Sequence, residues 1–472
     1  MLVYRTIQGG LRFILSVFYR QIEIVGLEHV PDEGDGPVIF AGNHPNSLLD
    51  PALITTSCGR VVHFAAKDVL FKSPALRVVL DAMGAVPIAR RADHGGGSSV
   101  DNSEAFDGMF RVLGEGRAMG IFPEGLSHDE AQLARLKTGA ARIALGAHDK
   151  HPAQVIKIVP CGLNYMNRKR FRSRVLVQFG PPIVVDQARL ARWKQDEREE
   201  VRALTTELET AMRALTINAS DWDTLRVIDG VRRLYQPANI TLEERVELSR
   251  RFTEAYKTLS HREDVRALMD RVRAYLDRLA ASGLSDRDLR RAVSARDALV
   301  RFFRHSVFTF VWLPLAAPGL TLFLPAGLAI RLLAPVFAPR RDVIGTTKFV
   351  LGLLAIVAMF AAVPFYATWR WGAGAGALSI LALLISGYAS LQVLARTSAL
   401  KSVGVTFGRL LFLRQELEAL RQERGELEAL VIDAVGRLRP AEMTPLFPER
   451  AGQGRPQTSD DSKDDTDDGD KK

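Results

Sequence analysis

The chain has 472 residues, of which 47% are hydrophobic and 25% are charged, enough for two or three domains with sizeable cores. Its net charge of +9 fits an anionic surface or an anionic substrate. The basic residues are spread along the chain without interleaved aromatic residues, which argues against nucleic acid as a partner and favours lipid headgroups. The two cysteines, Cys58 and Cys161, show no pairing pattern and indicate a reducing compartment.

The first segment, residues 1–20, has an apolar run too short to span a membrane, with Arg5, Arg12 and Arg20 between its apolar positions. It has no features of a cleavable signal peptide and predicts an amphipathic helix that lies on the membrane surface. The alternative interpretation is a first helix that packs on the domain that follows.

Residues 38–51 read VIFAGNHPNSLLDP and form the most informative pattern of the chain. The apolar run predicts a buried strand that ends at the turn signal Gly42-Asn43, and His44 follows this turn. Asp50 falls in the first turns of a predicted helix. Histidine is the side chain most easily poised as a base near neutral pH, and a carboxylate on its other ring nitrogen would fix its tautomer. Taken alone, the segment also fits a structural histidine, which is the commoner case.

Three later segments have a similar form. Residues 84–90 (GAVPIAR), 121–125 (IFPEG) and 155–165 (VIKIVPCGLNY) each contain a strand-like run that ends in polar residues. Open α/β sheets collect their sites at the carboxyl ends of strands, so these segments are expected to meet near His44.

The four blocks NHPNSLLD, GAVPIAR, FPEG and VPCGLNY, in this order, resemble the glycerophospholipid acyltransferase family. That family includes acyltransferases of glycerol 3-phosphate and of lysophosphatidic acid. The resemblance implies an α/β acyltransferase domain, a mixed sheet flanked by helices, over residues 21–185. Five residues separate His44 from Asp50, where the usual family pattern has four, and the longer spacing is similar to a branch with glycerol-3-phosphate/dihydroxyacetone-phosphate acyltransferases. Pro87 stands where many members have an aromatic residue.

The residue types predict how such a site would work. His44 would remove the proton from an acceptor hydroxyl that attacks a thioester carbonyl, and Asp50 would orient His44, so that no covalent acyl-enzyme is needed. Arg90 is the best candidate to bind a phosphate on the acceptor, because a guanidinium can donate two hydrogen bonds to it, and Arg91 is the second candidate. Lys137 is a third, and it fits a solvated surface charge equally well.

The FPEG turn is implied, by the resemblance, to be part of the acceptor-binding site through Glu124 and Gly125. The alternative interpretation is an ordinary Pro-Glu-Gly turn. A backbone amide near His44 or Gly125 is the expected stabiliser of the oxyanion.

Other chemistries are poorly supported by the sequence. Ser47 lacks the Gly-x-Ser-x-Gly pattern of a hydrolase, and the glycine-rich segment 95–99 is not followed by the Lys-Ser/Thr of a nucleotide-binding loop. The histidines have no metal-ligand spacing. We therefore predict no metal and no cofactor, with the thioester of acyl-CoA or acyl carrier protein as co-substrate.

Two kinds of helical region follow the predicted acyltransferase domain. Residues 186–300 are rich in Leu, Arg, Glu and Ala at helical spacing and predict a soluble helical region. Residues 301–400 predict a membrane region, because the stretches 306–330, 349–368 and 371–395 contain no charged residue. The second and third stretches predict spanning helices in a tight hairpin, whereas the prolines of the first disfavour one continuous helix.

The charges on either side orient this hairpin. Lysines and arginines precede its first helix and follow its second, while Arg370 is the one basic residue between them. The positive-inside rule places both flanks in the cytoplasm, together with a catalytic domain that needs cytosolic thioesters. The stretch 306–330 must then enter and leave the membrane on the same side, as a re-entrant segment. Residues 401–440 predict an amphipathic helix or short coiled coil, and residues 441–472 a disordered acidic tail.

These features together predict an integral membrane O-acyltransferase of phospholipid synthesis with its catalytic domain on the cytoplasmic face. It would transfer a fatty acyl group from a thioester to a hydroxyl of glycerol 3-phosphate or of 1-acyl-glycerol-3-phosphate, with membrane lipids as partners. The alternative is a catalytically silent lipid-binding or scaffold protein on the same fold, and the presence of His44, Asp50, Arg90 and Glu124 argues against it.

Overall fold

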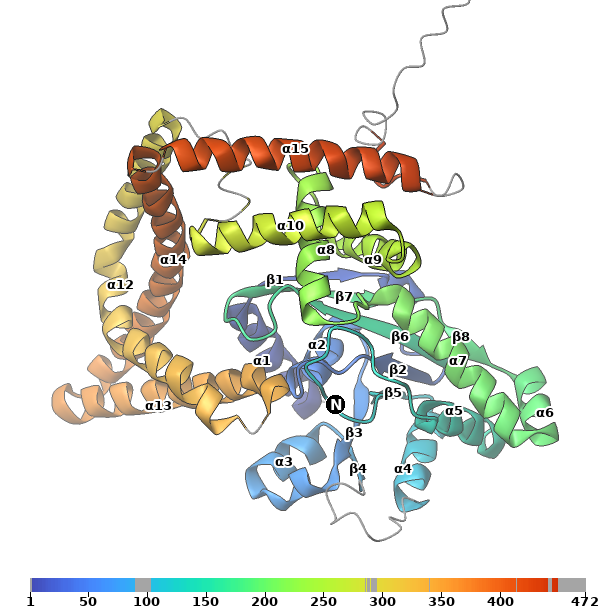
Figure 1. Cartoon of the computed structure of the whole chain (residues 1–472). Helices are drawn as coiled ribbons and strands as arrows, with labels where there is room; N and C mark the ends of the chain where they lie inside the picture. Colours follow the sequence, from blue (N-terminus) through green and yellow to red (C-terminus); the bar gives the residue numbers. More distant parts are fainter. Residues whose placement is uncertain are drawn as a thin grey trace, which may run out of the picture.

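The computed structural model describes residues 2–89, 103–284, 286, 289, 295–338, 340–412, 414–439 and 444–448 (Figure 1). The strands are β1 (Tyr19–Val25), β2 (Val38–Gly42), β3 (Val62–Lys67), β4 (Val86–Ile88), β5 (Ala118–Ile121), β6 (Ile156–Tyr165), β7 (Ser173–Phe179) and β8 (Ile183–Val185). The helices that flank them are α1 (Leu2–Phe18), α2 (Leu49–Ser57), α3 (Pro74–Ala82), α4 (Ser103–Gly114), α5 (Gly139–Lys150), α6 (Gln187–Gln195) and α7 (Glu197–Leu215). The later helices are α8 (Trp222–Tyr235), α9 (Leu242–Leu259), α10 (Glu263–Ala281), α12 (Ala295–Phe337), α13 (Ile344–Trp371), α14 (Ala373–Phe412) and α15 (Arg414–Leu438).

The eight strands form one mixed sheet in the order β1-β7-β6-β2-β5-β3-β4, with β8 paired to β6. Strands β6, β2, β5, β3 and β4 are parallel to one another, while β7 and β8 run antiparallel to β6. The predicted fold class, a mixed sheet flanked by helices, is confirmed. Because the parallel strands share a direction, the residues that follow them meet at one edge of the sheet.

Helices cover both faces of this sheet. One face packs on α4, α5 and α7 through residues such as Met109, Leu145 and Leu208, and the other packs on α1 and α2 through Leu15 and Leu53. Burying each of these large apolar side chains stabilises the folded protein by on the order of 1.5–3 kcal/mol. Strand β2 is buried along its whole length, so the core fixes the strand from which the site loop begins. Helix α7 thus belongs to the core of the sheet domain, although its residues fall within the predicted helical region 186–300.

Helix α1 combines the two interpretations of the first segment. Its inner face packs on the domain, where the Tyr4 hydroxyl accepts a hydrogen bond from the Val62 amide at 2.8 Å. Its outer face leaves Leu2 and Phe13 exposed by 82% and 66%. The binding of this face to a membrane surface stays a prediction.

A second helical body forms from parts that lie far apart in the sequence. Helices α8, α9, α10 and α15 share one hydrophobic cluster, in which Val272 and Leu427 are fully buried. Arg424 of α15 donates a hydrogen bond to the buried Asp286 at 3.0 Å. The amphipathic helix predicted within residues 401–440 therefore packs back on the helices of the 186–300 region. Of the predicted tail, 441–472, only residues 444–448 lie within the described residues.

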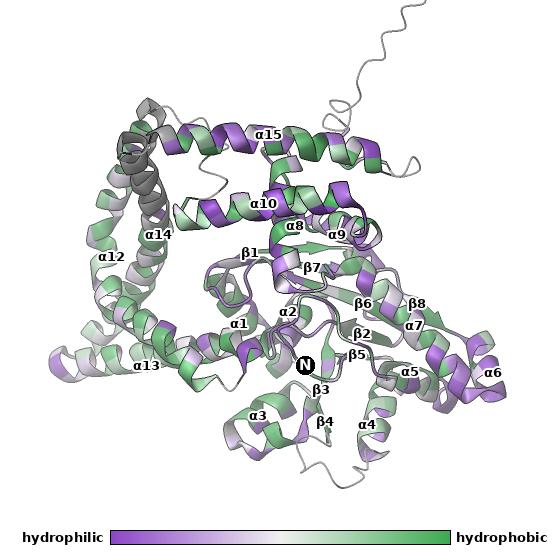
Figure 2. Cartoon of the chain, viewed as in Figure 1, coloured by the Kyte–Doolittle hydropathy of each residue, from purple (hydrophilic) through white to green (hydrophobic). Residues whose placement is uncertain are grey.

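Among the described residues, three helices are long and apolar enough to cross a membrane, within residues 302–337, 341–371 and 373–397. They lie together at one side of the molecule, and their surface is largely hydrophobic (Figure 2). Large apolar side chains such as Phe310, Val336 and Phe365 are each at least 74% exposed. An exposed apolar surface of this extent fits association with a membrane.

The first of these helices differs from the sequence expectation. The prolines of 306–330 disfavour one continuous helix, and the structure differs from this expectation, because α12 continues from Ala295 to Phe337 with Pro314, Pro318 and Pro325 inside it. It bends on its way, as Figure 1 shows. Packing on α14 supports the helix across these prolines: Gly319 lies so close to Ser386 that a Cβ would be 2.5 Å from the Ser386 carbonyl oxygen. Re-entry into the membrane stays a prediction.

Candidate active site

The loop between β2 and α2 brings His44 and Asp50 together. His44 lies two residues after β2, and Asp50 is the second residue of α2. The His44 Nδ1 atom lies 2.8 Å from Asp50 Oδ2, and the Asp50 side chain is fully buried while that of His44 is 13% exposed. The predicted pair is therefore present in the structure, and its catalytic role stays a prediction.

The extra residue of the His44–Asp50 spacing is absorbed by a tight turn. Ser47 has a φ of 50°, in the left-handed region that serine adopts only at a cost. This turn directs the Asn46 amide at Asp50 Oδ2, at 2.7 Å. The Tyr165 hydroxyl at the end of β6 donates to the other oxygen, Oδ1, at 2.5 Å. Both oxygens of Asp50 are thus engaged on protein donors.

Tyr165 remains a hydrogen-bond donor over the physiological range. Its pKa is raised well above the usual value, first by burial and then by the negative charge of Asp50. The deprotonated phenol is therefore disfavoured, and the O–H continues to point at the carboxylate.

The imidazole of His44 is held on its face as well as at its edge. It stacks on the ring of Phe122, with centroids 4.0 Å apart and an interplanar angle of 9°, and Phe122 in turn stacks on Phe64. When Nδ1–H donates to Asp50, Nε2 carries the lone pair, and within the described residues Nε2 has no hydrogen-bond partner. This is the arrangement of a general base with one nitrogen left for a substrate proton.

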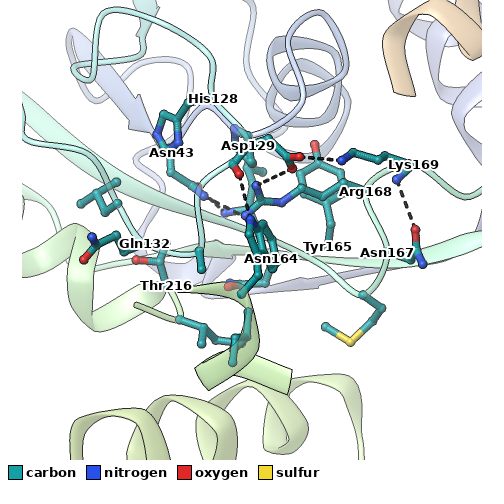
Figure 3. A pocket seen from close by; sticks show the side chains of 18 of the residues that line it. Asn43, His128, Asp129, Gln132, Asn164, Tyr165, Asn167, Arg168, Lys169 and Thr216 are labelled. Carbon is teal, nitrogen blue, oxygen red and sulfur yellow. Dashed lines mark hydrogen bonds and ion pairs between the residues drawn. The ribbon is translucent and has the colours of Figure 1, made fainter. Parts of the chain in front are cut away.

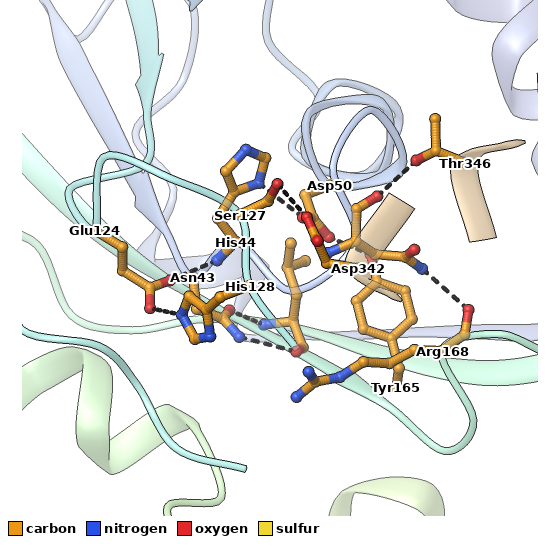
Figure 4. A network of polar contacts seen from close by, with 12 residues as sticks. Asn43, His44, Asp50, Glu124, Ser127, His128, Tyr165, Arg168, Asp342 and Thr346 are labelled. Atoms are coloured by element: carbon orange, nitrogen blue, oxygen red, sulfur yellow. Dashed lines mark hydrogen bonds and ion pairs between the residues drawn. The ribbon is translucent and has the colours of Figure 1, made fainter. Parts of the chain in front are cut away.

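Glu124 of the FPEG turn holds the backbone of His44. Its side chain is buried, with Oε1 accepting from the His44 amide at 2.7 Å and Oε2 accepting from the Ala134 amide at 2.8 Å. Oε2 also binds His128 Nε2, and the His128 amide donates to the His44 carbonyl oxygen at 3.2 Å. Residues 124–128 thus clamp His44 on both sides of its peptide (Figure 4). Binding of the acceptor by Glu124, implied by the resemblance, stays a prediction.

The ring of His128 is paired with the carboxylate of Glu124. The hydrogen bond to Glu124 raises the pKa of His128 above its ordinary value, against the opposing effect of burial. Protonation of His128 therefore strengthens the clamp around His44.

Gly125 and Lys137 lie against each other. Gly125 has a φ of 76°, which favours glycine, and a Cβ there would be 2.6 Å from Lys137 Nζ. The Lys137 side chain therefore lies over the FPEG turn, where its positive charge can attract an anionic substrate. The amides of His44 and Gly125 themselves cannot serve as oxyanion donors in this arrangement, since they already donate to Glu124 and to the Phe122 carbonyl oxygen.

Arg90 and Arg91, the predicted phosphate ligands, lie outside the described residues. Strand β4 ends two residues before Arg90, and it is parallel to β3. The chain therefore leaves β4 at the same edge of the sheet at which His44 follows β2.

A cavity of about 620 Å³ lies beside the clamp, between β6 and α8 (Figure 3). Its polar walls include Arg168 and Lys169, both paired with Asp129, at 3.6 and 2.5 Å. The Arg168 guanidinium also lies over the Trp222 ring, 4.9 Å from its centroid. The cavity reaches the site at Asn43, Pro45, Glu124, His128 and Tyr165.

Sequence reasoning missed four residues that build this site: Asn43, Phe122, His128 and Tyr165. Asn43 joins β2 to β6 by donating to the Leu163 carbonyl oxygen at 3.2 Å and accepting from its amide at 2.7 Å. Three of the four lie inside the quoted blocks, and His128 follows Glu124 by four residues. Their positions in the blocks were visible, but their pairing depends on which strands become neighbours.

Two family models match the chain. The acyltransferase model matches residues 21–164, and the model of the glycerol-3-phosphate acyltransferase 2 C-terminal domain matches residues 227–443. The second match covers most of α8 together with α9, α10, the three apolar helices and α15; of these, α8, α9, α10 and α15 share one hydrophobic cluster.

The chain is also similar to individual acyltransferases. Glycerol-3-phosphate O-acyltransferase 2 of Saccharomyces cerevisiae is 34% identical over 57% of this chain and 38% of the yeast protein. Glycerol-3-phosphate O-acyltransferase 1 of that yeast is 32% identical over 54% of this chain and 36% of its own length. A crystal structure of the 1-acyl-sn-glycerophosphate (LPA) acyltransferase PlsC from Thermotoga maritima aligns with 44% of this chain and 79% of its own, at 20% identity and a TM-score of 0.30.

The fold and the matched model define residues 21–164 as an acyltransferase domain. The second domain match and the similarity to the yeast proteins support the resemblance to the glycerophospholipid acyltransferase family that the four blocks predicted. The chain spans well under half the length of the yeast relatives that it matches.

Proposed function

We propose that this protein is an acyltransferase that moves a fatty acyl group from a thioester, acyl-CoA or acyl carrier protein, to a hydroxyl of glycerol 3-phosphate. The observation behind this proposal is the His44–Asp50 pair, with Nδ1 bound at 2.8 Å and Nε2 left for a substrate. A catalytically silent scaffold would have no need to keep a buried carboxylate aligned on an imidazole by two further donors.

The reaction follows from the geometry of this pair. Nε2 takes the proton of the acceptor hydroxyl as its oxygen attacks the thioester carbonyl carbon. The C–S bond then breaks, and the thiolate receives the proton from the imidazolium, so that an ester and a free thiol result. Asp50 stabilises the imidazolium between these two steps.

Glycerol 3-phosphate is the favoured acceptor, with 1-acyl-glycerol-3-phosphate as the second candidate. The two yeast relatives and the matched C-terminal domain model are all named for glycerol-3-phosphate acyltransferases. The longer His44–Asp50 spacing is similar to the branch that includes such enzymes. The described residues offer the phosphate two candidate binding places: Lys137 over the FPEG turn, or Arg168 and Lys169 in the cavity.

We further propose that the catalytic domain lies on the cytoplasmic face. The segment between α12 and α13 contacts the catalytic domain, where Asp342 accepts a hydrogen bond from Ser127 at 2.6 Å. After α14, helix α15 packs on α8 and α10. These contacts at both ends of the α13–α14 hairpin support the proposal, as does the bias of lysine and arginine. A single cysteine introduced as Arg370→Cys at the hairpin tip should react with impermeant reagents only from the far side.

The activity is tested with membranes that contain the wild-type protein or His44→Ala, incubated with labelled acyl-CoA and either glycerol 3-phosphate or lysophosphatidic acid. We expect label in lysophosphatidic acid from the first acceptor and its complete loss in the variant, because the base is gone. Label in phosphatidic acid alone would make lysophosphatidic acid the acceptor. Absence of transfer with acyl-CoA and with acyl carrier protein would favour the scaffold, and normal turnover in His44→Ala would remove His44 as the base.

A further inference from the structure

The start of helix α13 contacts the loops that hold His44. We call Arg340, Asp342, Gly345, Thr346 and Lys348 the α13 head. It precedes the apolar body of the first hairpin helix, yet Asp342 and Thr346 are buried, with 6% and 4% exposure, against the acyltransferase domain. The two elements are some 300 residues apart in the sequence. The start of a predicted membrane helix therefore contacts the loop that follows His44 (Figure 4).

One contact of the α13 head leads directly to the catalytic pair. The Thr346 hydroxyl donates to the Asn46 carbonyl oxygen at 2.9 Å. The amide of the same Asn46 donates to Asp50 Oδ2 at 2.7 Å, and this is the oxygen that binds His44 Nδ1. Asn46 lies between His44 and Asp50, so Thr346 binds the segment that joins the two members of the pair.

Gly345 allows this approach. A Cβ at position 345 would lie 2.4 Å from Asn46 Oδ1 and 2.9 Å from the Arg168 carbonyl oxygen. The second neighbour is backbone, and Asn46 itself donates from Nδ2 to that same carbonyl at 3.3 Å. Any side chain at this position must therefore move the helix away from the loop.

The α13 head also contacts residues 124–128, which bind the peptide of His44 from the other side. Asp342 accepts from the Ser127 hydroxyl at 2.6 Å, and Arg340 donates to both Ser127 and Asp342, at 2.9 and 2.8 Å. Ser127 lies between Glu124 and His128, the two residues that hold the His44 peptide. Lys348 completes the contact by donating to the Lys169 carbonyl oxygen at 2.8 Å.

From these contacts we infer that the α13 head is a positioning element for the His44–Asp50 pair, so that proton transfer by His44 depends on the docked membrane hairpin. This inference rests on the proposed function, because it assigns the head a role in the same reaction. Thr346 and Gly345 touch neither substrate nor the reacting atoms, and they act through Asn46.

The first test compares Gly345→Ala with Gly352→Ala in the full chain in membranes. Both substitutions add one methyl group to a glycine of α13, but a Cβ at position 352 meets no atom within 4 Å. We expect Gly345→Ala to lower kcat by roughly ten- to a hundred-fold, as a misplaced catalytic group does, with KM for both substrates within about twofold. Gly352→Ala should leave both constants at the wild-type values. Equal kinetics for the two variants would overturn the inference.

The second test isolates the hydroxyl of Thr346. Thr346→Val removes it at constant shape, Thr346→Ser keeps it, and Thr347→Val removes a hydroxyl that binds within its own helix, to the Val343 carbonyl oxygen at 3.0 Å. We expect a fall in kcat in Thr346→Val only, with Thr346→Ser restoring it. If Thr347→Val lowers kcat by the same factor, or if Thr346→Ser does not restore kcat, the hydroxyl of Thr346 has no specific role and the effect is one of packing.

Hydrogen exchange separates failure of this inference from failure of the proposed function. Amides of residues 46–50 should exchange faster in Gly345→Ala than in Gly352→Ala, whatever reaction the protein performs. Unchanged exchange in this loop would overturn the positioning role even if the acyltransferase activity is present. Faster exchange in a chain without acyl transfer would show the coupling of helix and loop, and would count against the proposed reaction alone.

Discussion

His44 is held by two regions of the acyltransferase domain that act on different parts of it. The loop and helix that follow β2 supply Asp50, which binds the imidazole ring, and the segment between β5 and α5 supplies Glu124, which binds the backbone amide. Both carboxylates are buried, and both have their two oxygens engaged. The difference is that the ring gains a proton in the proposed reaction, whereas the amide does not change.

This difference decides what each carboxylate can do for catalysis. An interaction accelerates a reaction when it is stronger in the transition state than in the ground state. The attraction between Asp50 and His44 increases as the imidazole becomes an imidazolium, while the bond from the His44 amide to Glu124 stays the same. Asp50 should therefore act mainly on kcat, and Glu124 mainly on the position of the loop.

The largest effect is expected for Asp50→Asn. An amide can present its NH₂ group to His44, which would favour the wrong tautomer, and the loss in kcat should be roughly 10³- to 10⁴-fold. The matched variant Glu124→Gln keeps an oxygen for the His44 amide and should cost roughly ten- to a hundred-fold. Steady-state kinetics on membranes with equal amounts of protein decides this, and a smaller loss in Asp50→Asn than in Glu124→Gln would reverse the assignment.

A smaller effect is expected for Tyr165→Phe, which removes the donor to Asp50 Oδ1. The carboxylate oxygen then stays buried without that partner, at a cost of about 1–3 kcal/mol in stability, and kcat should fall by roughly ten-fold. KM values should stay close to those of the wild type, because the pair itself remains. Thermal unfolding in detergent together with kinetics measures both effects; full activity with normal stability would mean that the hydroxyl is dispensable.

Much of this site could be predicted because its parts are contiguous in the sequence. The apolar run of β2, the Gly42-Asn43 turn and the start of α2 place His44 and Asp50 within one short segment, so local rules suffice. Tyr165 lies 115 residues from Asp50, and no local rule pairs them. Their contact follows from the neighbouring positions of β2 and β6 in the sheet, which periodicity does not specify.

The C-terminal half was harder to predict for a related reason. The apolar stretches were visible as composition, but the continuity of α12 depends on its packing against α14, and the contact of Thr346 with Asn46 depends on the whole fold. The Leu-rich positions and Glu/Arg pairs of α15 predicted an amphipathic helix or a short coiled coil, but not its partner. Its buried face, with Leu427 and Val431, meets a partner surface built by α8 and α10.

The two candidate places for the acceptor phosphate can be separated by their lysines. Lys137→Met removes the charge over the FPEG turn, and Lys169→Met removes a charge of the cavity, with little change in length. If the phosphate binds at the turn, Lys137→Met should raise KM for glycerol 3-phosphate roughly five- to ten-fold with kcat little changed, and Lys169→Met should not. The reverse result would place the phosphate in the cavity, and an effect confined to the KM of acyl-CoA would move Lys137 to the donor side.

The smallest effect concerns the pH dependence of the contact between Glu124 and His128. The pKa of His128 is higher in the folded protein than its ordinary value of 6.5, because it binds Glu124. The stabilisation is therefore fully present below the unfolded pKa and is lost as the pH rises through the raised folded pKa. The thermal stability of the wild type should exceed that of His128→Gln most at low pH, and this excess should shrink as the pH rises. His261→Gln, at an exposed histidine of the other helical body, is the control. A difference between wild type and His128→Gln that stays constant with pH would show that the clamp depends on shape and not on charge.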